Sequence, residues 1–215
     1  MSYLRSPERQ RQILSCARKV FAERGFHGAN VSHICAEAGI GRGTLYLYFE
    51  NKRAVLVAIL EDLVSRVKAL MARRHIPRIP RETARALTRD QIVAFSEGRL
   101  AELLGVVFSD QQTLRIVLRE AVGLDVDIDK ILATMDATLI SIVERDLIAA
   151  RDELGLVRDG IDLHHVATMV VGGVEKLALA ALRGDIASDL PALIRSVVQF
   201  HLYGTMKPQA EGGVG

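Results

Sequence analysis

Apolar residues recur at intervals of three and four along almost the whole chain, and no stretch sustains an alternation of apolar and polar residues. The first spacing places side chains on one face of an α-helix, whereas alternation is the pattern of a half-buried strand. The pattern therefore predicts an all-α protein of about nine helices. With 215 residues, of which 49% are hydrophobic, the chain is long enough to bury a core in one or two domains.

Residues that start and stop helices divide the N-terminal part into three helices. The first is expected to begin after Ser6 and to end at Gly25; the second, about 31–38, ends at Gly39; the third covers about 42–48. Two short helices joined by a glycine turn form the helix-turn-helix arrangement, whose later helix enters the major groove of DNA. Helical hairpins are common, so this arrangement alone is weak evidence for DNA binding.

The rest of the chain is expected to form a separate helical domain. A fourth helix, about 52–71, follows Asn51 and connects the first domain, 1–55, to a basic segment with two prolines and a weakly helical end, which marks the boundary. The second domain is expected over 72–206, and the polar, glycine-rich 207–215 is expected to be disordered. The further helices are expected near 89–108, 110–121, 127–153, 162–183 and 189–204.

Charge is distributed unevenly along the chain. Residues 1–90 hold 17 Lys and Arg against 8 Asp and Glu, a net charge of +9, whereas residues 91–215 carry a net charge of −7. The overall charge of +2 conceals this division. A chain polarised in this way indicates that its N-terminal part meets a polyanion and that its C-terminal part does not.

The stretch from Gly39 to Lys52, GIGRGTLYLYFENK, makes the helix-turn-helix prediction specific. With its surroundings, from about Arg11 to Leu56, it resembles the DNA-binding domain of the TetR family. The positions that match the family's pattern are Phe21 and Gly25 in the first helix, Ile34, Cys35, Ala38 and Gly39 in the second, Gly43, Thr44, Leu45, Tyr46, Tyr48 and Phe49 in the third, and Lys52 in the fourth. The match covers about a quarter of the chain, and the remainder fits the family only in length and in the number and order of helices.

The resemblance implies a set of DNA contacts that the chemistry of the side chains supports. Arg42 can reach a guanine edge or a phosphate, and the hydroxyl groups of the threonine and the two tyrosines in the third helix can reach phosphate oxygens. Lys52 and Asn30 lie at helix N-termini, where backbone N–H groups receive a phosphate. The full predicted set is Asn30, Arg42, Gly43, Thr44, Tyr46, Leu47, Tyr48 and Lys52. Each of these residues alone is more often a solvated surface residue, and their joint spacing is what favours DNA.

Two positions depart from the family's pattern. Gly41 stands where a Ser or Thr cap is usual, which costs only a few tenths of a kcal/mol. Leu47 stands where a larger polar or aromatic residue is common, so it either touches a thymine methyl group or is simply exposed. Neither departure affects the expected fold, but both obscure which DNA sequence is read.

The resemblance also implies that the C-terminal domain binds a small molecule. Aromatic residues are sparse after the basic segment and Trp is absent, which argues against a pocket that holds flat cations between rings. An apolar or acyl-type ligand fits the aliphatic composition better. The residues expected to contact it are Arg115, Arg119, Thr134, Met135, Thr138, Thr168 and Glu175. Residues of these types at helical spacing more often fill a core or form surface ion pairs.

The last two long helices carry broad apolar faces with small residues that permit close approach. Such faces suit a four-helix bundle built from two copies, as the resemblance also implies; the alternative is that they pack within one chain. The expected dimer interface consists of Val166, Val170, Gly173, Val174, Leu177, Leu190, Ile194 and Val197. A homodimer places two recognition helices in adjacent major grooves, so the expected partner is double-stranded DNA with a palindromic operator.

Motifs of catalysis and metal binding are absent from the sequence. No His, Cys or Asp spacing is typical of zinc, and no catalytic triad or phosphate-binding glycine loop is recognisable. We therefore expect no cofactor, no metal and no enzymatic activity, although a catalytic set can converge from distant positions. The N-terminus does not resemble a signal peptide, and the longest apolar run, Val166–Val174, is too short to span a membrane. The chain is therefore expected in the cytoplasm.

These observations predict a homodimeric, ligand-responsive transcriptional regulator, most simply a repressor that a small ligand releases from its operator. The alternative from another class is a ligand-independent DNA-organising or partner-binding adaptor on the same scaffold. An internal cavity in the second domain distinguishes the two, because the adaptor needs none.

Overall fold

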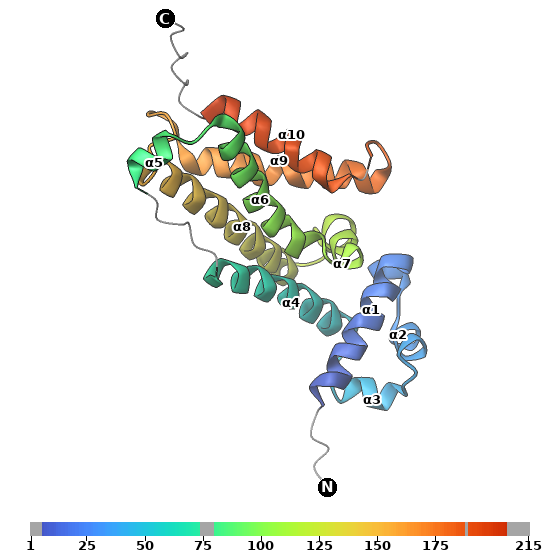
Figure 1. Ribbon diagram of the computed structural model, residues 1–215. Helices are drawn as coiled ribbons and strands as arrows, with labels where there is room; N and C mark the ends of the chain where they lie inside the picture. The colour runs from blue at the N-terminus through green and yellow to red at the C-terminus, as the bar shows by residue number, and fades with distance from the viewer. Residues whose placement is uncertain (1–5, 74–79, 188, 206–215) are drawn as a thin grey trace, which may run out of the picture. The chain divides into compact units, whose positions relative to one another are not determined.

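The computed structural model describes residues 6–73, 80–187 and 189–205, and every regular element in that part of the chain is a helix (Figure 1). The N-terminal helices are α1 (Pro7–Gly28), α2 (Val31–Ala38), α3 (Arg42–Tyr46) and α4 (Lys52–Arg73). They are followed by α5 (Arg81–Arg85), α6 (Arg89–Phe108), α7 (Gln111–Ile116) and one π-helical turn, η1 (Val117–Ala121). The last helices are α8 (Val126–Asp152), α9 (Leu163–Arg183) and α10 (Leu190–Thr205). The predicted all-α fold is confirmed.

Most helix bounds fall within two residues of the predicted ones, because capping residues mark them. Asp110 and Asp162 each accept a hydrogen bond from the backbone N–H three residues on, at 3.0 Å. α8 begins one residue earlier than expected because its cap is Asp125, whose carboxylate accepts from the backbone N–H groups of Asp127 and Ile128 at 3.0 Å. The predicted tail lies outside the described residues.

Three details differ from the prediction. α1 spans Pro7–Gly28, but Gly25 within it has the non-helical φ 69° and ψ 162°, so the regular helix is interrupted at the predicted glycine and a further turn follows. α3 ends at Tyr46, two residues earlier than expected. The helix expected over 110–121 changes from α to π at Val117. The short helix α5 corresponds to the weakly helical end that the basic segment predicts.

Contacts within the chain divide it into two compact units, and the division differs from the expected domain boundary. The first unit contains the described residues up to Ala69 together with Val106–Met135. The second contains Leu70–Gly105 together with the described residues from Asp136 onward. Residues 106–135, which were expected in the C-terminal domain, therefore belong with the N-terminal helices. Helices α4, α6 and α8 each contribute residues to both units.

The core of the first unit is built mainly from α1, α2 and α4. The side chains with almost no exposed surface include Ile13, Ala17, Phe21, Ile34, Leu45, Val55, Leu56, Ile59 and Leu60. They are the residues that the helical spacing predicts to share a face. Burying a large apolar side chain contributes about 1.5–3 kcal/mol. Because Leu45 of α3 is part of this core, the core fixes the position of the short third helix.

Ion pairs explain why the segment after α6 joins the first unit. Arg18 of α1 lies 3.2 Å from the carboxylate of Asp110, which precedes α7. Arg53 of α4 donates two hydrogen bonds, at 2.7 and 2.8 Å, to the carboxylate of Asp125, which precedes α8. Such contacts between residues far apart in the sequence are not visible in helical periodicity, so the sequence alone does not group residues 106–135 with the N-terminal helices.

In the second unit, α9 and α10 lie side by side (Figure 1). The buried face of α9 consists of Leu163, Val166, Ala167, Val170, Val174 and Ala178. By length and composition alone α9 is apolar enough to cross a membrane, with a mean hydropathy of 1.4 over 18 residues, of which 28% are buried within the chain. The expected absence of such a segment rested on uninterrupted apolar runs, and the charges of Glu175 and Lys176 interrupt this one. Core helices of soluble proteins share this property.

Candidate functional site

α2 and α3 form the helix-turn-helix, and local hydrogen bonds set its geometry. The Asn30 side chain accepts from the backbone N–H of His33 at 3.0 Å, and His33 Nδ1 accepts from the backbone N–H of Asn30 at 3.3 Å. This pair closes a capping box at the start of α2. Gly39 ends α2 with φ 62° and ψ 36°, the left-handed conformation that favours glycine. The turn directs the chain into α3, whose N-cap is Gly41.

One face of α3 is buried and the opposite face is exposed. Leu45 and Phe49 are buried, four residues apart, and Thr44 and Tyr48 are half-buried at the rim. The exposed residues are Arg42, Gly43, Tyr46 and Leu47, of which Tyr46 is 52% and Leu47 51% exposed. A guanidinium, a tyrosine ring and an aliphatic side chain on one exposed face can contact phosphates, sugars and thymine methyl groups.

Two predicted DNA contacts are held in place by other residues of the first unit. The hydroxyl of Tyr48 accepts a hydrogen bond from the backbone N–H of Ser6 at 3.0 Å, and its own hydrogen can still be donated to a phosphate oxygen. Because Ser6 caps α1, a phosphate bound by Tyr48 would lie at the start of that helix. Arg42 donates to the hydroxyl of Ser32 in the first turn of α2, which orients its guanidinium.

The structure gives Lys52 a different role from the predicted phosphate contact. Its ammonium group donates to the backbone carbonyls of Phe26 and Ala29, at 2.7 and 2.8 Å, with a longer contact of 3.4 Å to the carbonyl of His27. An ammonium has three donors, so these carbonyls occupy them. Lys52 thus fastens the end of α1 to the start of α4. The start of α4 is capped by Asn51, whose side chain accepts from the backbone three residues on at 2.9 Å.

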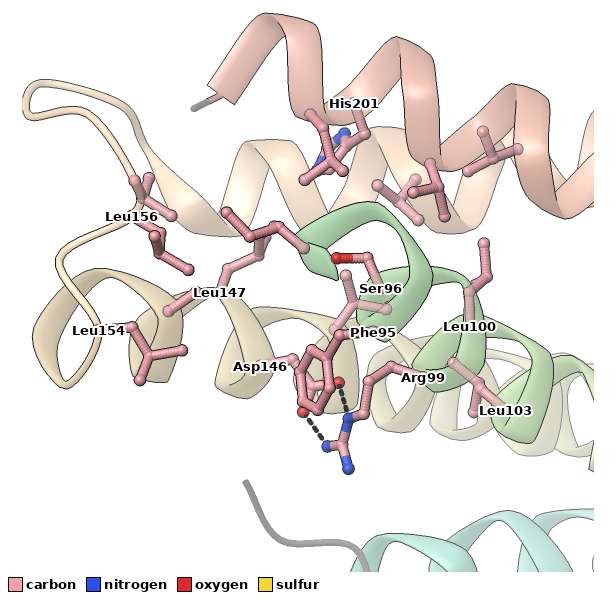
Figure 2. Close-up of a pocket in the computed structure, with 18 residues that line it drawn as sticks. Phe95, Ser96, Arg99, Leu100, Leu103, Asp146, Leu147, Leu154, Leu156 and His201 are labelled. Carbon is pink, nitrogen blue, oxygen red and sulfur yellow. Dashed lines mark hydrogen bonds and ion pairs between the residues drawn. The ribbon is translucent and has the colours of Figure 1, made fainter. Parts of the chain in front are cut away.

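The second unit contains a cavity of about 140 Å³ with mainly aliphatic walls (Figure 2). It is lined by α6, α8 and α10, by one residue of α9 and by the segment that follows α8. Fourteen of the eighteen lining residues are apolar. The four polar ones are Ser96, Arg99, Asp146 and His201. Burial lowers the pKa of His201, so this side chain is uncharged near neutral pH.

Arg99 and Asp146 form an ion pair across the wall of this cavity, from α6 to α8 (Figure 2). Arg99 Nε lies 3.2 Å from Asp146 Oδ2, and Arg99 Nη2 lies 2.5 Å from Asp146 Oδ1. The side chains are only 15% and 18% exposed. Sequence reasoning missed this pair. A signal was present, because Arg99 lies in the apolar stripe of α6 formed by Ile92, Phe95 and Leu103.

None of the seven residues predicted to contact a ligand lines this cavity. Arg115, Arg119, Thr134, Thr168 and Glu175 are exposed, Thr138 is half-buried and Met135 is buried. The hydroxyl groups of Thr134 and Thr168 donate to backbone carbonyls four residues earlier, at 2.8 and 2.9 Å. A polar residue in an apolar helix suggests a ligand contact, but here the helix backbone itself satisfies the polarity of both threonines.

Four of the eight residues predicted to form a dimer interface are buried within the chain instead. They are Val166, Val170, Val174 and Ile194. Leu177, Leu190 and Val197 are half-buried and Gly173 is exposed. The large apolar residues that α9 and α10 expose are Met169 and Phe200, at 66% and 84%. Helical spacing reveals that a face is apolar, but not whether a partner or the chain's own core covers it.

Comparisons with known proteins agree with the helix-turn-helix. Residues 13–59 match the model of the family described as bacterial regulatory proteins, tetR family. The fatty acid metabolism regulator protein of Bacillus subtilis is 25% identical over 194 residues, which cover 90% of this chain and 93% of that protein. The similarity therefore continues well beyond the DNA-binding helices.

Solved structures share the fold along nearly the whole chain. FadR from Bacillus subtilis, in complex with stearoyl-CoA, superposes with a TM-score of 0.67 at 21% identity, covering 90% of this chain and 98% of that one. SmeT, the repressor of the Stenotrophomonas maltophilia multidrug efflux pump SmeDEF, superposes with a TM-score of 0.66 at 25% identity, covering 96% and 95%. The chain therefore carries an N-terminal helix-turn-helix domain of the tetR family and is a DNA-binding transcriptional regulator.

Proposed function

We propose that this regulator is a repressor that leaves its operator when a small apolar molecule occupies the cavity of the second unit. The observation that carries the proposal is the cavity itself, of about 140 Å³, with fourteen apolar residues in its walls. Apolar surface that no side chain of the protein covers costs stability, and concave apolar pockets are the usual sites of small molecules. A ligand-independent adaptor gains nothing from such a cavity, whereas a receptor for a small molecule requires one.

The size of the cavity limits the ligand. An engineered cavity of about 150 Å³ in another protein binds benzene, so this one holds a single ring or a chain of about six to eight carbons by the same comparison. The FadR relative was solved with stearoyl-CoA, which has a much longer chain. An acyl group of that length fits here only if the lining helices move apart. A compact apolar molecule is the better match to this chain.

We infer that the exposed face of α3 binds double-stranded DNA. Arg42, Tyr46 and Leu47 lie together on that face, and the N-terminal ninety residues carry a net charge of +9. Basic residues raise DNA affinity by releasing the counterions of the phosphates. Thr44 and Tyr48 reach phosphates from the rim. Because the chain acts on DNA, we place it in the cytoplasm.

We further infer that the regulator is a homodimer on a palindromic operator. One helix-turn-helix makes few phosphate contacts, whereas two can occupy adjacent major grooves. Met169 and Phe200 are exposed apolar residues on α9 and α10, and a second copy that covers them removes this surface from water. Phe200→Lys should therefore give monomers in analytical ultracentrifugation, while Gln199→Lys, an exposed neighbour, should not. A Phe200→Lys protein that remains dimeric contradicts this interface.

The helices that carry the cavity provide a route from ligand to DNA. α6 and α8 contribute the cavity's charged residues, and both helices continue into the unit that contains the helix-turn-helix, as α4 does. A ligand that displaces α6 or α8 in the second unit therefore acts on helices whose other ends belong to the first unit. The ligand must bind the DNA-incompetent state more tightly than the DNA-bound state, because equal affinity for both shifts nothing.

The test uses the full chain and an operator selected from random double-stranded DNA. Molecules released from the purified protein are identified by mass spectrometry, and octan-1-ol and benzyl alcohol serve as defined probes in a gel shift. Ala150→Phe fills the cavity without changing a polar residue, and Ala133→Phe, exposed on the same helix, is the control. Ligand should dissociate the operator complex of the natural protein and of Ala133→Phe, but not that of Ala150→Phe.

Two results would contradict the proposal in different ways. If a molecule binds the cavity and leaves operator affinity unchanged, the release step is wrong. If no small molecule binds and Ala150→Phe behaves like the natural protein, the chain acts as a ligand-independent adaptor.

A further inference from the structure

The walls of the cavity are apolar except at four residues, Ser96, Arg99, Asp146 and His201. Among the eighteen lining residues the charged ones are Arg99 and Asp146, and they pair with each other at 2.5 and 3.2 Å. Arg99 comes from α6 and Asp146 from α8, so the pair joins two helices at the cavity wall (Figure 2). Both side chains are largely withdrawn from solvent.

Stability alone is a poor explanation for this pair. Withdrawing two charges from water costs about as much as their attraction returns, and replacing a buried ion pair by apolar residues is often neutral or stabilising. The surroundings are already aliphatic, so leucine or methionine would fit the wall chemically. A guanidinium at the edge of an apolar cavity can form two parallel hydrogen bonds to a carboxylate, which an apolar residue cannot.

The remaining polar residues indicate the charge of the ligand. Ser96, Arg99 and His201 can each donate a hydrogen bond, whereas Asp146 is the sole acidic residue among those that line the cavity. A bound cation finds no second acid in the lining to balance it. The set of side chains therefore favours an anion with an apolar body.

We propose that Arg99 is the specificity-determining residue of the cavity and binds the carboxylate of a small amphipathic acid, which replaces Asp146 on the guanidinium group. This inference rests on the proposed function, because it names the class of molecule that occupies the same cavity. The apolar body of the acid lies against the aliphatic walls, and its carboxylate accepts the two N–H groups that Asp146 accepts in this structure. The exchange also removes a contact between α6 and α8, which gives the ligand a direct effect on both helices.

The test compares acids with alcohols of the same skeleton by isothermal titration calorimetry on the full chain at pH 7. The probes are octanoic acid with octan-1-ol, and benzoic acid with benzyl alcohol. Each acid should bind at least about tenfold more tightly than its alcohol, the effect of a charge-assisted hydrogen-bond pair. Asp146→Asn removes the competing charge, so it should tighten acid binding about tenfold and leave alcohol binding unchanged.

A double variant keeps the test independent of folding. Arg99→Met alone would remove the cation that pairs with the largely buried carboxylate of Asp146, which can unfold the protein. Arg99→Met combined with Asp146→Asn removes both charges; this variant should bind the alcohols and lose the preference for acids. Arg158→Met, which removes an exposed charge that does not line the cavity, should keep that preference.

Each outcome decides a separate question. If the natural protein binds alcohols as tightly as acids, or if the double variant still prefers acids, Arg99 is not the specificity residue and the proposed cavity function stands. If none of the four probes binds the natural protein, the proposed function fails and this inference fails with it.

Discussion

The ammonium group of Lys52 donates a hydrogen bond to the backbone carbonyl of Phe26 at 2.7 Å and lies 4.5 Å from the centre of the Phe26 ring. This contact joins the start of α4 to the end of α1, just beyond the kink at Gly25. A lysine that the family pattern places beside DNA therefore also holds the DNA-binding helices together. Substitution at this position therefore tests which of the two roles the lysine has.

Replacing Lys52 by Met should destabilise the first unit. Met retains an apolar stem but removes the donors to the carbonyls of Phe26 and Ala29. Hydrogen bonds to charged groups contribute about 1.5–3 kcal/mol when well shielded, and Lys52 is only half-buried, so we expect a loss of about 1–2 kcal/mol in urea unfolding. Lys68→Met, exposed on the same helix, should change stability by less than about 0.5 kcal/mol. Unchanged stability with weakened DNA binding would restore the phosphate role of Lys52.

Two glycines with positive φ should respond differently to asparagine. Gly39 has φ 62° and ψ 36°, a left-handed conformation that Asn tolerates, and nothing lies within 4 Å of the position of an added Cβ. Gly25 has φ 69° and ψ 162°, a region essentially restricted to glycine, and an added Cβ would lie 2.9 Å from a carboxylate oxygen of Glu120. That carboxylate accepts a hydrogen bond from the backbone N–H of Phe26 at 3.1 Å, which its movement would break.

Thermal unfolding should therefore show a small effect for Gly39→Asn, below about 1 kcal/mol, and a loss of more than about 2 kcal/mol for Gly25→Asn. Combining Gly25→Asn with Glu120→Ala relieves the close approach but not the backbone strain, so it should not restore full stability. Equal effects at the two glycines would contradict the argument.

The ion pair of Arg53 with Asp125 should make stability depend on pH in acid. Hydrogen bonds from Arg53 and from the backbone of Ile128 hold the pKa of Asp125 far below its usual range. In the unfolded chain the carboxyl has its ordinary pKa, about 3.9. Below about pH 4 the unfolded state therefore binds a proton that the folded state does not, and stability falls as the pH decreases towards the folded pKa.

Asp125→Asn should reduce stability at pH 7 and flatten the loss between pH 4 and pH 3, as measured by urea unfolding at each pH. Glu61→Gln, exposed on α4, should leave the pH profile unchanged. A parallel profile for Asp125→Asn and the natural protein would show that this carboxylate does not control acid stability.

The helices were predictable because the signals that set their ends are local. Ser6, Asn30, Asp110 and Asp162 each cap a helix, and such caps can be recognised from the sequence because a cap needs only a side chain near a backbone N–H three residues away. The π-helical turn was not predictable from such signals. Its Glu120 is bound by the backbone N–H of Phe26, 94 residues away in the sequence, and only the folded chain brings them together.

The DNA-binding face of α3 depends on local signals, whereas the cavity depends on contacts between distant residues. The exposure of Arg42, Tyr46 and Leu47 follows from the burial of Leu45 and Phe49 within one short helix, so spacing alone indicates it. The cavity needs residues of four helices, and the partners Arg99 and Asp146 are 47 residues apart. A charged residue within the apolar stripe of α6 can be recognised from the sequence, but its partner on α8 cannot.

Arg42→Ala should weaken operator binding without unfolding the protein, because Arg42 is exposed and donates to the hydroxyl of Ser32, an exposed contact rather than a core contact. If the guanidinium contacts a phosphate, affinity should fall for all sequences and the slope of log Kd against log salt should decrease by about one. If it contacts a guanine edge, discrimination at one base pair should fall by about 1–3 kcal/mol. Fluorescence anisotropy at several salt concentrations separates the two contacts.

The charge-matched control is Arg24→Ala, which removes an exposed arginine near the C-terminal end of α1. Equal losses for Arg24→Ala and Arg42→Ala would mean that net charge, and not the position of Arg42 on α3, determines the affinity.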